Sequence, residues 1–259
     1  MRISSLFAPF FALLAGAGGL YFRVTELLNV FDRQGLPERG AGITIALIVF
    51  SALFLLVDLL FSLRVSLKHT ASAGFENAFG TDALSYPMVF SAIGIVWLGA
   101  TVKHYFDLRT LEPFPRIELI FLALSGLSAV ALALFAIETY QDPRRKIIYA
   151  LSIVPTLFMC FWLIVLYRQN SSNPVLLGYL YQCLAITSAA LGFYFTSGFV
   201  YEKPAPGKAV FTYLASIYFC FVTLADGHST SISLIFAAII VTNVLSASML
   251  IRNLKWKSA

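Results

Sequence analysis

Residues 41–63 read AGITIALIVFSALFLLVDLLFSL, an apolar run of 23 residues that indicates the fold class. Its one charged residue is Asp58. A transmembrane helix needs about 20 consecutive, mainly apolar residues to cross a hydrocarbon layer of about 30 Å. The stretch therefore predicts a helix that crosses a membrane.

Seven further apolar runs of similar length occupy most of the remaining chain. They cover residues 5–22, 84–102, 117–140, 147–167, 175–197, 209–225 and 229–251. Of the 259 residues, 59% are hydrophobic and only 12% are charged, whereas soluble domains carry about 25% charged residues. Eight spans of this size use roughly 160 residues, so no connection is long enough for a soluble domain. The sequence predicts an all-α polytopic bundle, a single integral membrane domain over residues 1–259.

The number of spans depends on two segments. Residues 209–225 are near the lower length limit for a crossing helix, which leaves a count of seven open. The N-terminus also resembles a signal peptide, because a basic residue and an apolar run precede Ala15-Gly16-Ala17. Cleavage there would also leave seven spans, but Tyr21, Phe22 and Arg23 form a natural interfacial end for an uncleaved first span.

The distribution of Lys and Arg predicts the orientation. The N-terminus, the loops after the second, fourth and sixth spans, and the C-terminal tail hold eleven of these residues, and the opposite side holds seven. Positive flanks stay on the cytoplasmic side, so both termini are expected in the cytoplasm and residues 23–40 outside. The net charge of +5 fits this orientation and attraction to anionic lipid. The expected partner is the lipid bilayer, and the charge is no sign of nucleic-acid binding.

Small residues indicate which helices pack closely, because helices in lipid associate where backbones can approach. In the first span Ala12 and Gly16 lie on one face, and Ala15 and Gly19 on an adjacent one. In the sixth span a stripe runs through Gly178, Gln182, Ala185, Ala189 and Gly192. These two spans are predicted to form the packing core. Asn243 in the last span is expected to hydrogen-bond to a neighbouring helix.

Asp58 is the one ionisable residue clearly inside a predicted span. A charged side chain there is costly and by default marks a functional site. Thr44, Ser51, Asp58 and Ser62 follow one another at spacings of seven, seven and four residues, which places them on one helix face. That face is expected to point into the bundle or toward water, as a substrate or ion pathway. The structural alternative is an acid satisfied by nearby hydroxyl groups or an arginine.

Four further residues are expected in loops on the outer face: His104 and Asp107 after the third span, and Asp226 and His228 after the seventh. Together they could provide metal ligands or an acid–base pair. The simpler interpretation is that all four are solvated. The three histidines lack a metal-ligand spacing such as HExxH, and the three cysteines lie in spans without a CxxC spacing. The sequence predicts neither a metal site nor a cofactor.

The segment YFRVTELLNVFDRQGLP, residues 21–37, resembles a segment of uncharacterised multi-pass proteins of Gram-positive anaerobic bacteria. The resemblance covers one span end and one loop. It implies a bacterial cytoplasmic membrane and carries no function with it.

Three classes of function remain open. A small-solute carrier is indicated by the many spans, Asp58 and its polar stripe, and a possible inverted repeat that relates residues 19–58 to 192–226. An accessory, sensing or scaffold protein that binds another membrane protein is indicated by the sparse charge and the absence of a catalytic motif. A membrane-embedded enzyme would require the outer His and Asp residues to converge.

Overall fold

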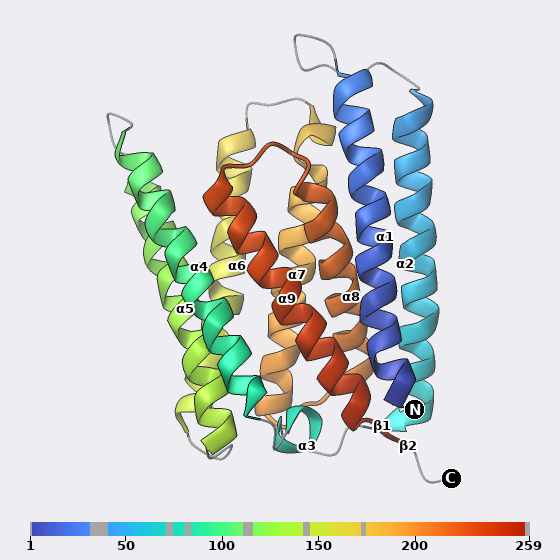
Figure 1. Ribbon diagram of the computed structural model, residues 1–259, viewed down its shortest axis with the longest axis vertical. Coiled ribbons are helices and arrows are strands. Elements are labelled where there is room, and N and C mark those ends of the chain that lie inside the picture. The colour runs from blue at the N-terminus through green and yellow to red at the C-terminus, as the bar shows by residue number, and fades with distance from the viewer. Residues whose placement is uncertain are drawn as a thin grey trace.

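The bundle consists of long helices that run side by side (Figure 1). The computed structural model describes residues 2–31, 41–70, 75–80, 84–110, 116–141, 146–171 and 175–256. Within these ranges the long helices are α1 (Arg2–Asn29), α2 (Gly42–Lys68), α4 (Ser85–Arg109), α5 (Arg116–Gln141), α6 (Ile147–Asn170), α7 (Leu180–Val200), α8 (Pro206–Thr223) and α9 (Thr230–Asn253). The prediction of an all-α membrane bundle is confirmed.

All of these helices except α8 are long and apolar enough to cross a membrane. The chain is therefore a multi-pass membrane protein. Helix α8 has 18 residues, or about 27 Å at 1.5 Å per residue. It packs against α1, α2, α7 and α9, and 14 of its residues are buried. A helix covered by protein on several sides needs less apolar surface than one that faces lipid.

Short elements close one end of the bundle. The helix α3 (Phe75–Phe79) and the two-residue strands β1 (His69–Thr70) and β2 (Lys255–Trp256) lie there, with β1 and β2 paired antiparallel. Both chain termini are at this end as well (Figure 1). We call it the inner end, following the predicted orientation, and the opposite end the outer end. At the outer end the 3₁₀ helix η1 (Leu176–Gly178) precedes α7.

Two helices are longer than the apolar spans predicted for them. Helix α1 continues to Asn29, beyond the span over residues 5–22, and α4 continues to Arg109, beyond the span over residues 84–102. The extra turns hold charged residues that form ion pairs. Residues 176–178 form η1, so Gly178 is not part of the small-residue stripe of α7.

The small residues of α1 and α7 bring both helices close to α8. A methyl group added at Gly16 would lie 2.8 Å from Phe221 Cβ, and one at Gly19 would lie 2.6 Å from Val222 Cγ2. On α7, Ala185 and Ala189 are fully buried. The two predicted core helices thus pack on a third, α8, whose central position the sequence did not indicate. Asn243 of α9 donates to Ser216 Oγ of α8 at 2.9 Å, which confirms its predicted interhelical hydrogen bond.

Candidate functional site

The polar stripe of α2 faces α1 and α8. Ser51 donates to the Leu47 carbonyl at 2.8 Å, and its hydroxyl also lies 2.8 Å from the Tyr218 hydroxyl of α8. Ser62 donates to the Gly207 carbonyl at 2.7 Å. The Thr44 hydroxyl is covered and has no hydrogen-bond partner among the described residues. Hydroxyl groups on this face therefore join α2 to α8 at two levels.

Asp58 lies between these two levels and is only 4% exposed. Neither of its carboxylate oxygens has a hydrogen-bond partner in the described part of the chain. The hydroxyl groups of the stripe thus do not satisfy it, and among the described residues no arginine does either. The structural alternative for Asp58 lacks the partners that it requires.

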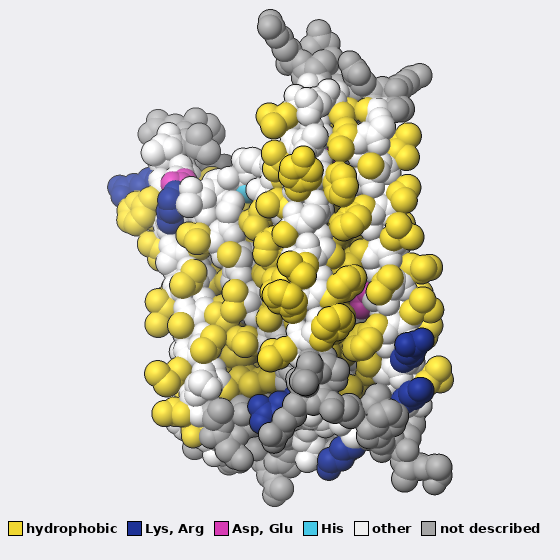
Figure 2. Space-filling view, turned by 45° about the vertical axis from the view of Figure 1, so that its right-hand side comes forward, with side chains coloured by type: hydrophobic (Ala, Val, Ile, Leu, Met, Phe, Trp, Pro, Cys, Tyr) yellow, Lys and Arg dark blue, Asp and Glu magenta, His cyan; other side chains and the backbone are white. Residues whose placement is uncertain are grey.

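Asp58 is part of the wall of a pocket of about 170 Å³ between α1, α2 and α8. The other wall residues are apolar and include Phe7 and Phe11 from α1, Phe54, Val57 and Phe61 from α2, and Leu214 from α8. Phe7, Phe11 and Val57 are 66%, 41% and 47% exposed, so this side of the pocket borders the apolar outer surface. Figure 2 shows that surface, with apolar side chains over α1 and α2 and a hollow between the two helices.

The surroundings of Asp58 disfavour a bare negative charge. Transfer of an unpaired charge from water into an apolar environment costs several kcal/mol or more. The group must therefore hold a proton or a bound cation. Aromatic rings also attract cations through their negatively polarised faces, so the walls suit the same kind of ligand as the carboxylate.

At the outer end, Asp226 belongs to a buried ion-pair cluster that the sequence did not reveal. The guanidinium group of Arg23 is fully buried, and its Nε lies 2.6 Å from Asp226 Oδ1. Its Nη1 donates to Glu26 Oε2 at 2.7 Å, and its Nη2 donates to the Leu177 carbonyl at 2.9 Å. Arg23 was expected in the loop after the first span, but it lies within α1 and ties that helix to the α8–α9 loop and to η1.

The Thr223 hydroxyl connects Asp226 to His228. It donates to Asp226 Oδ2 at 2.9 Å and lies 3.0 Å from His228 Nε2. Burial raises the pKa of Asp226, and Arg23 opposes that shift. Burial lowers the pKa of His228, and Asp226 opposes that shift. The environment therefore favours a neutral imidazole.

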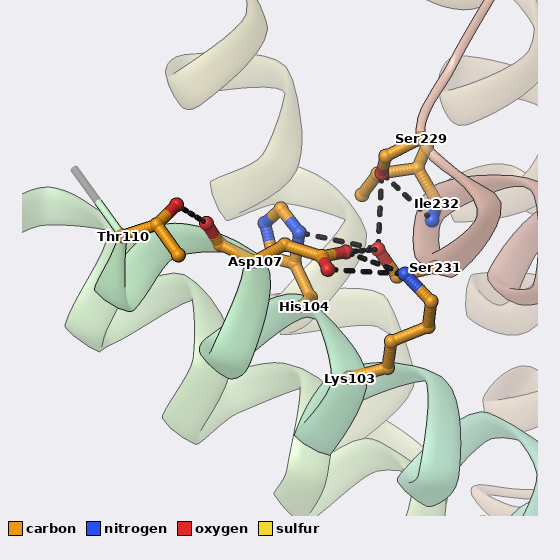
Figure 3. Close-up of polar contacts among 7 residues, drawn as sticks. All are labelled: Lys103, His104, Asp107, Thr110, Ser229, Ser231 and Ile232. Atoms are coloured by element: carbon orange, nitrogen blue, oxygen red, sulfur yellow. Dashed lines mark hydrogen bonds and ion pairs between the residues drawn. The ribbon is translucent and has the colours of Figure 1, made fainter.

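His104 and Asp107 form a separate group at the outer end (Figure 3). They lie on the last turns of α4 and not in a loop as predicted, and they contact the first turn of α9. Asp107 Oδ2 accepts from Ser231 at 3.0 Å and lies 2.8 Å from Lys103 Nζ. His104 Nδ1 lies 3.5 Å from the Ser231 hydroxyl.

The other ring nitrogen of His104 faces an acid on α5. His104 Nε2 lies 3.8 Å from Glu118 Oε2, and Gln169 of α6 donates to the other Glu118 oxygen at 3.0 Å. Glu118 is buried although it lies in the first turn of its helix, and no motif in the sequence indicated its role.

The contacts thus divide the four predicted outer residues into two groups. Asp226 and His228 share Thr223, whereas His104 and Asp107 share Ser231. Over the described ranges, no three His, Cys, Asp or Glu side chains form a group that could hold a metal ion. This arrangement ties helix ends together and leaves the convergence needed for a joint catalytic site unsupported.

Comparison of the chain with protein-family models, curated protein sequences and solved structures found no match. The resemblance of residues 21–37 therefore stays a prediction.

Proposed function

We propose that the chain is a small-solute carrier in which Asp58 is the coupling group. The observation that carries this proposal is a buried carboxyl group with no partner among the described residues, in the wall of a pocket. A carrier needs a group whose charge is neutralised by a proton or by its solute, and Asp58 has the surroundings of such a group. Its neighbours on the stripe, Thr44, Ser51 and Ser62, are proposed to line the same pathway.

Polar groups of α1, α2, α7 and α8 support a pathway toward the outer end. Ser51 stands seven residues, or about 10 Å, from Asp58 and contacts the Tyr218 hydroxyl. Tyr181 interacts with Ser51 and lies beside Arg23, whose guanidinium is 5.2 Å from its ring centre. Phe54 lies between Ser51 and Asp58 along α2, and its ring stacks on that of Tyr218 with the ring centroids 4.4 Å apart. In this arrangement Phe54 separates Asp58 from the outer polar groups, as a gate would.

The cellular location is part of the same proposal. The resemblance of residues 21–37 and the excess of Lys and Arg at the inner end support a bacterial cytoplasmic membrane with both termini in the cytoplasm. Of the described basic side chains in Figure 2, several lie below the apolar band at the inner end, and others lie at the outer end.

Proton movement in proteoliposomes tests the carrier. Vesicles that hold the purified chain and an internal pH dye receive a panel of cationic, anionic and neutral small solutes. We expect at least one solute to move protons with the wild type and not with Asp58→Asn. The matched control is Asp107→Asn, which removes an exposed acid from α4 and should leave the signal unchanged.

The second candidate is a non-catalytic accessory, sensing or scaffold protein, and the packing of the interior favours it. A cavity among α3, α4, α5, α6, α7 and α9 has a volume of only about 30 Å³, room for no more than a few water molecules, although a larger pocket of about 440 Å³ lies between α6 and α7. If no solute of the panel moves protons, and the Asp58→Asn variant folds as well as the wild type, the scaffold is supported. An enzyme that uses the outer residues is the least supported, because they form two groups.

A further inference from the structure

We infer that the Asp58 pocket takes a lipophilic amine from the bilayer and exchanges it for a proton. This inference rests on the proposed function, because it names the class of solute for the same site. The proposed ligand is an alkylammonium ion: one cationic nitrogen on an apolar body.

The shape and composition of the pocket favour this class. Apolar and aromatic side chains from three helices form the wall, and Asp58 is its one acidic residue, with carboxyl oxygens that are covered and add no polar surface to the pocket. A water-soluble cation would lose its hydration there and gain only one partner, whereas an amphiphilic amine also buries an apolar chain. Since Phe7, Phe11 and Val57 lie on the exposed side, the amine can enter sideways between α1 and α2 without crossing the packed interior.

Charge balance requires that one proton leaves for each ammonium ion that binds. The resting site holds the neutral acid, because the wall offers Asp58 no counter-charge. When the ammonium ion enters, the Asp58 O–H bond breaks, the carboxylate pairs with the ammonium nitrogen, and the proton leaves to water. One positive charge enters and one leaves, so the site stays neutral throughout. For this pairing the covered carboxyl oxygens must turn toward the pocket by a change of side-chain rotamer.

No other charge competes for this exchange among the described residues that surround Asp58. The wall residues from α1, α2 and α8 are all apolar apart from Asp58 itself, and no described charged group acts on it electrostatically. The nearest basic residue along α2 is Arg64, which is exposed six positions further on. The proton released on binding is therefore that of Asp58.

The experiment measures amine binding and proton release together. The protein in phosphatidylcholine nanodiscs is titrated with dodecylamine in a weakly buffered solution with a pH dye near pH 7, where an alkylamine is protonated. We expect one proton released per amine bound, and none with 1-dodecanol, which has the same chain and no charge. Asp58→Asn should weaken amine binding at least about tenfold, the range for a lost charge-assisted hydrogen bond, and should release no proton.

A second pair of variants works even if Asp58→Asn folds poorly. Val57→Trp fills the pocket from its exposed side, and Val49→Trp places the same ring at a position of α2 that is 50% exposed and outside the pocket wall. Only Val57→Trp should reduce binding. The inference is overturned if Val57→Trp binds dodecylamine as tightly as Val49→Trp and the wild type do. It is also overturned if the wild type binds dodecylamine without releasing protons.

The two proposals fail differently. If other solutes drive Asp58-dependent proton movement and dodecylamine does not bind, the amine proposal is overturned and the carrier proposal stands. Amine–proton exchange in nanodiscs, without proton movement in vesicles, would support the binding site and overturn the carrier.

Discussion

Arg23 and Asp58 are both buried, but their charges are balanced in different ways. Arg23 has a carboxylate on either side and a carbonyl as third partner. Asp58 has none of these among the described residues. A buried charge that is paired contributes to the structure, whereas an unpaired one stays available to a ligand or proton. This contrast separates the structural cluster from the proposed functional one.

Removal of Arg23 should strongly destabilise the fold. Arg23→Met leaves Glu26 and Asp226 buried without their counter-ion, at a cost of about 3 to 5 kcal/mol in the free energy of unfolding. Unfolding in SDS, followed by circular dichroism, measures this loss. The triple variant Arg23→Met, Glu26→Gln, Asp226→Asn should recover much of it, because no charge is then left unpaired.

The matched control is Lys103→Met, which breaks an ion pair whose side chains are 46% and 40% exposed. It should barely change the unfolding midpoint, because solvent-exposed pairs contribute little. A similar loss in both single variants would contradict the structural role of the Arg23 cluster.

His228 should titrate below the ordinary histidine value of about 6.5. Burial disfavours the imidazolium form and lowers the pKa, while Asp226 raises it. In carbon-detected NMR of histidine-labelled protein, the His228 ring should stay neutral at pH 6.5 and gain its proton only at lower pH. Asp226→Asn should lower the midpoint further, since the opposing charge is gone. A midpoint above 6.5 in the wild type would show that burial is not dominant.

The sequence identified Asp58 because hydropathy alone singles out an acid inside an apolar run. It could not identify Arg23, since Arg23 follows the first apolar run and its partner Asp226 is 203 residues away. Likewise, a helical spacing placed Ser51 and Ser62 on one face, but nothing in it indicated that Asp58 lacks a partner.

Among the helices, α8 shows that hydropathy along the sequence does not reveal a helix's position in the bundle. The other long helices face lipid on part of their surface and must be apolar there. Helix α8 is mostly covered by its neighbours, so it can carry Thr212, Ser216 and Tyr218 within its length. The sequence therefore predicted where α8 lies along the chain but not its central position among the other helices. Hydropathy indicates how well a helix suits lipid, and it does not indicate how much protein covers the helix.

Because α1 lies close to α8, we expect alanine substitutions at two glycines to differ in their effect on stability. Gly19→Ala would place a methyl group 2.6 Å from Val222 Cγ2 and 2.9 Å from the Tyr218 hydroxyl, and such overpacking costs about 1 to 3 kcal/mol. Gly99→Ala on α4 meets no atom within 4 Å and should be neutral or stabilising through its better helix propensity. SDS unfolding of the two variants measures the difference. Equal stability would show that α1 can move away from α8 at no cost.

At the scale of the whole molecule, the arrangement of the helices places both termini at one end, and the charge distribution predicts that this end is cytoplasmic. In a cysteine-free background with Ala at positions 160, 183 and 220, Lys68→Cys at the inner end should react with a membrane-impermeant maleimide only from the cytoplasmic side. Ser171→Cys at the outer end should react only from the outside. The reversed labelling would show that the orientation is inverted.

The contact between Arg23 and Asp226 also has a consequence for biogenesis. The ribosome delivers α1 to the membrane long before it has translated the loop that holds Asp226. Of its two acidic partners among the described residues, Arg23 has at that stage Glu26, three residues away, and not yet Asp226. The ion-pair cluster around Arg23 is therefore complete only once the α8–α9 loop has been made. A chain that stops before this loop presents an incompletely neutralised arginine to the bilayer, the kind of defect that membrane quality-control proteases can detect.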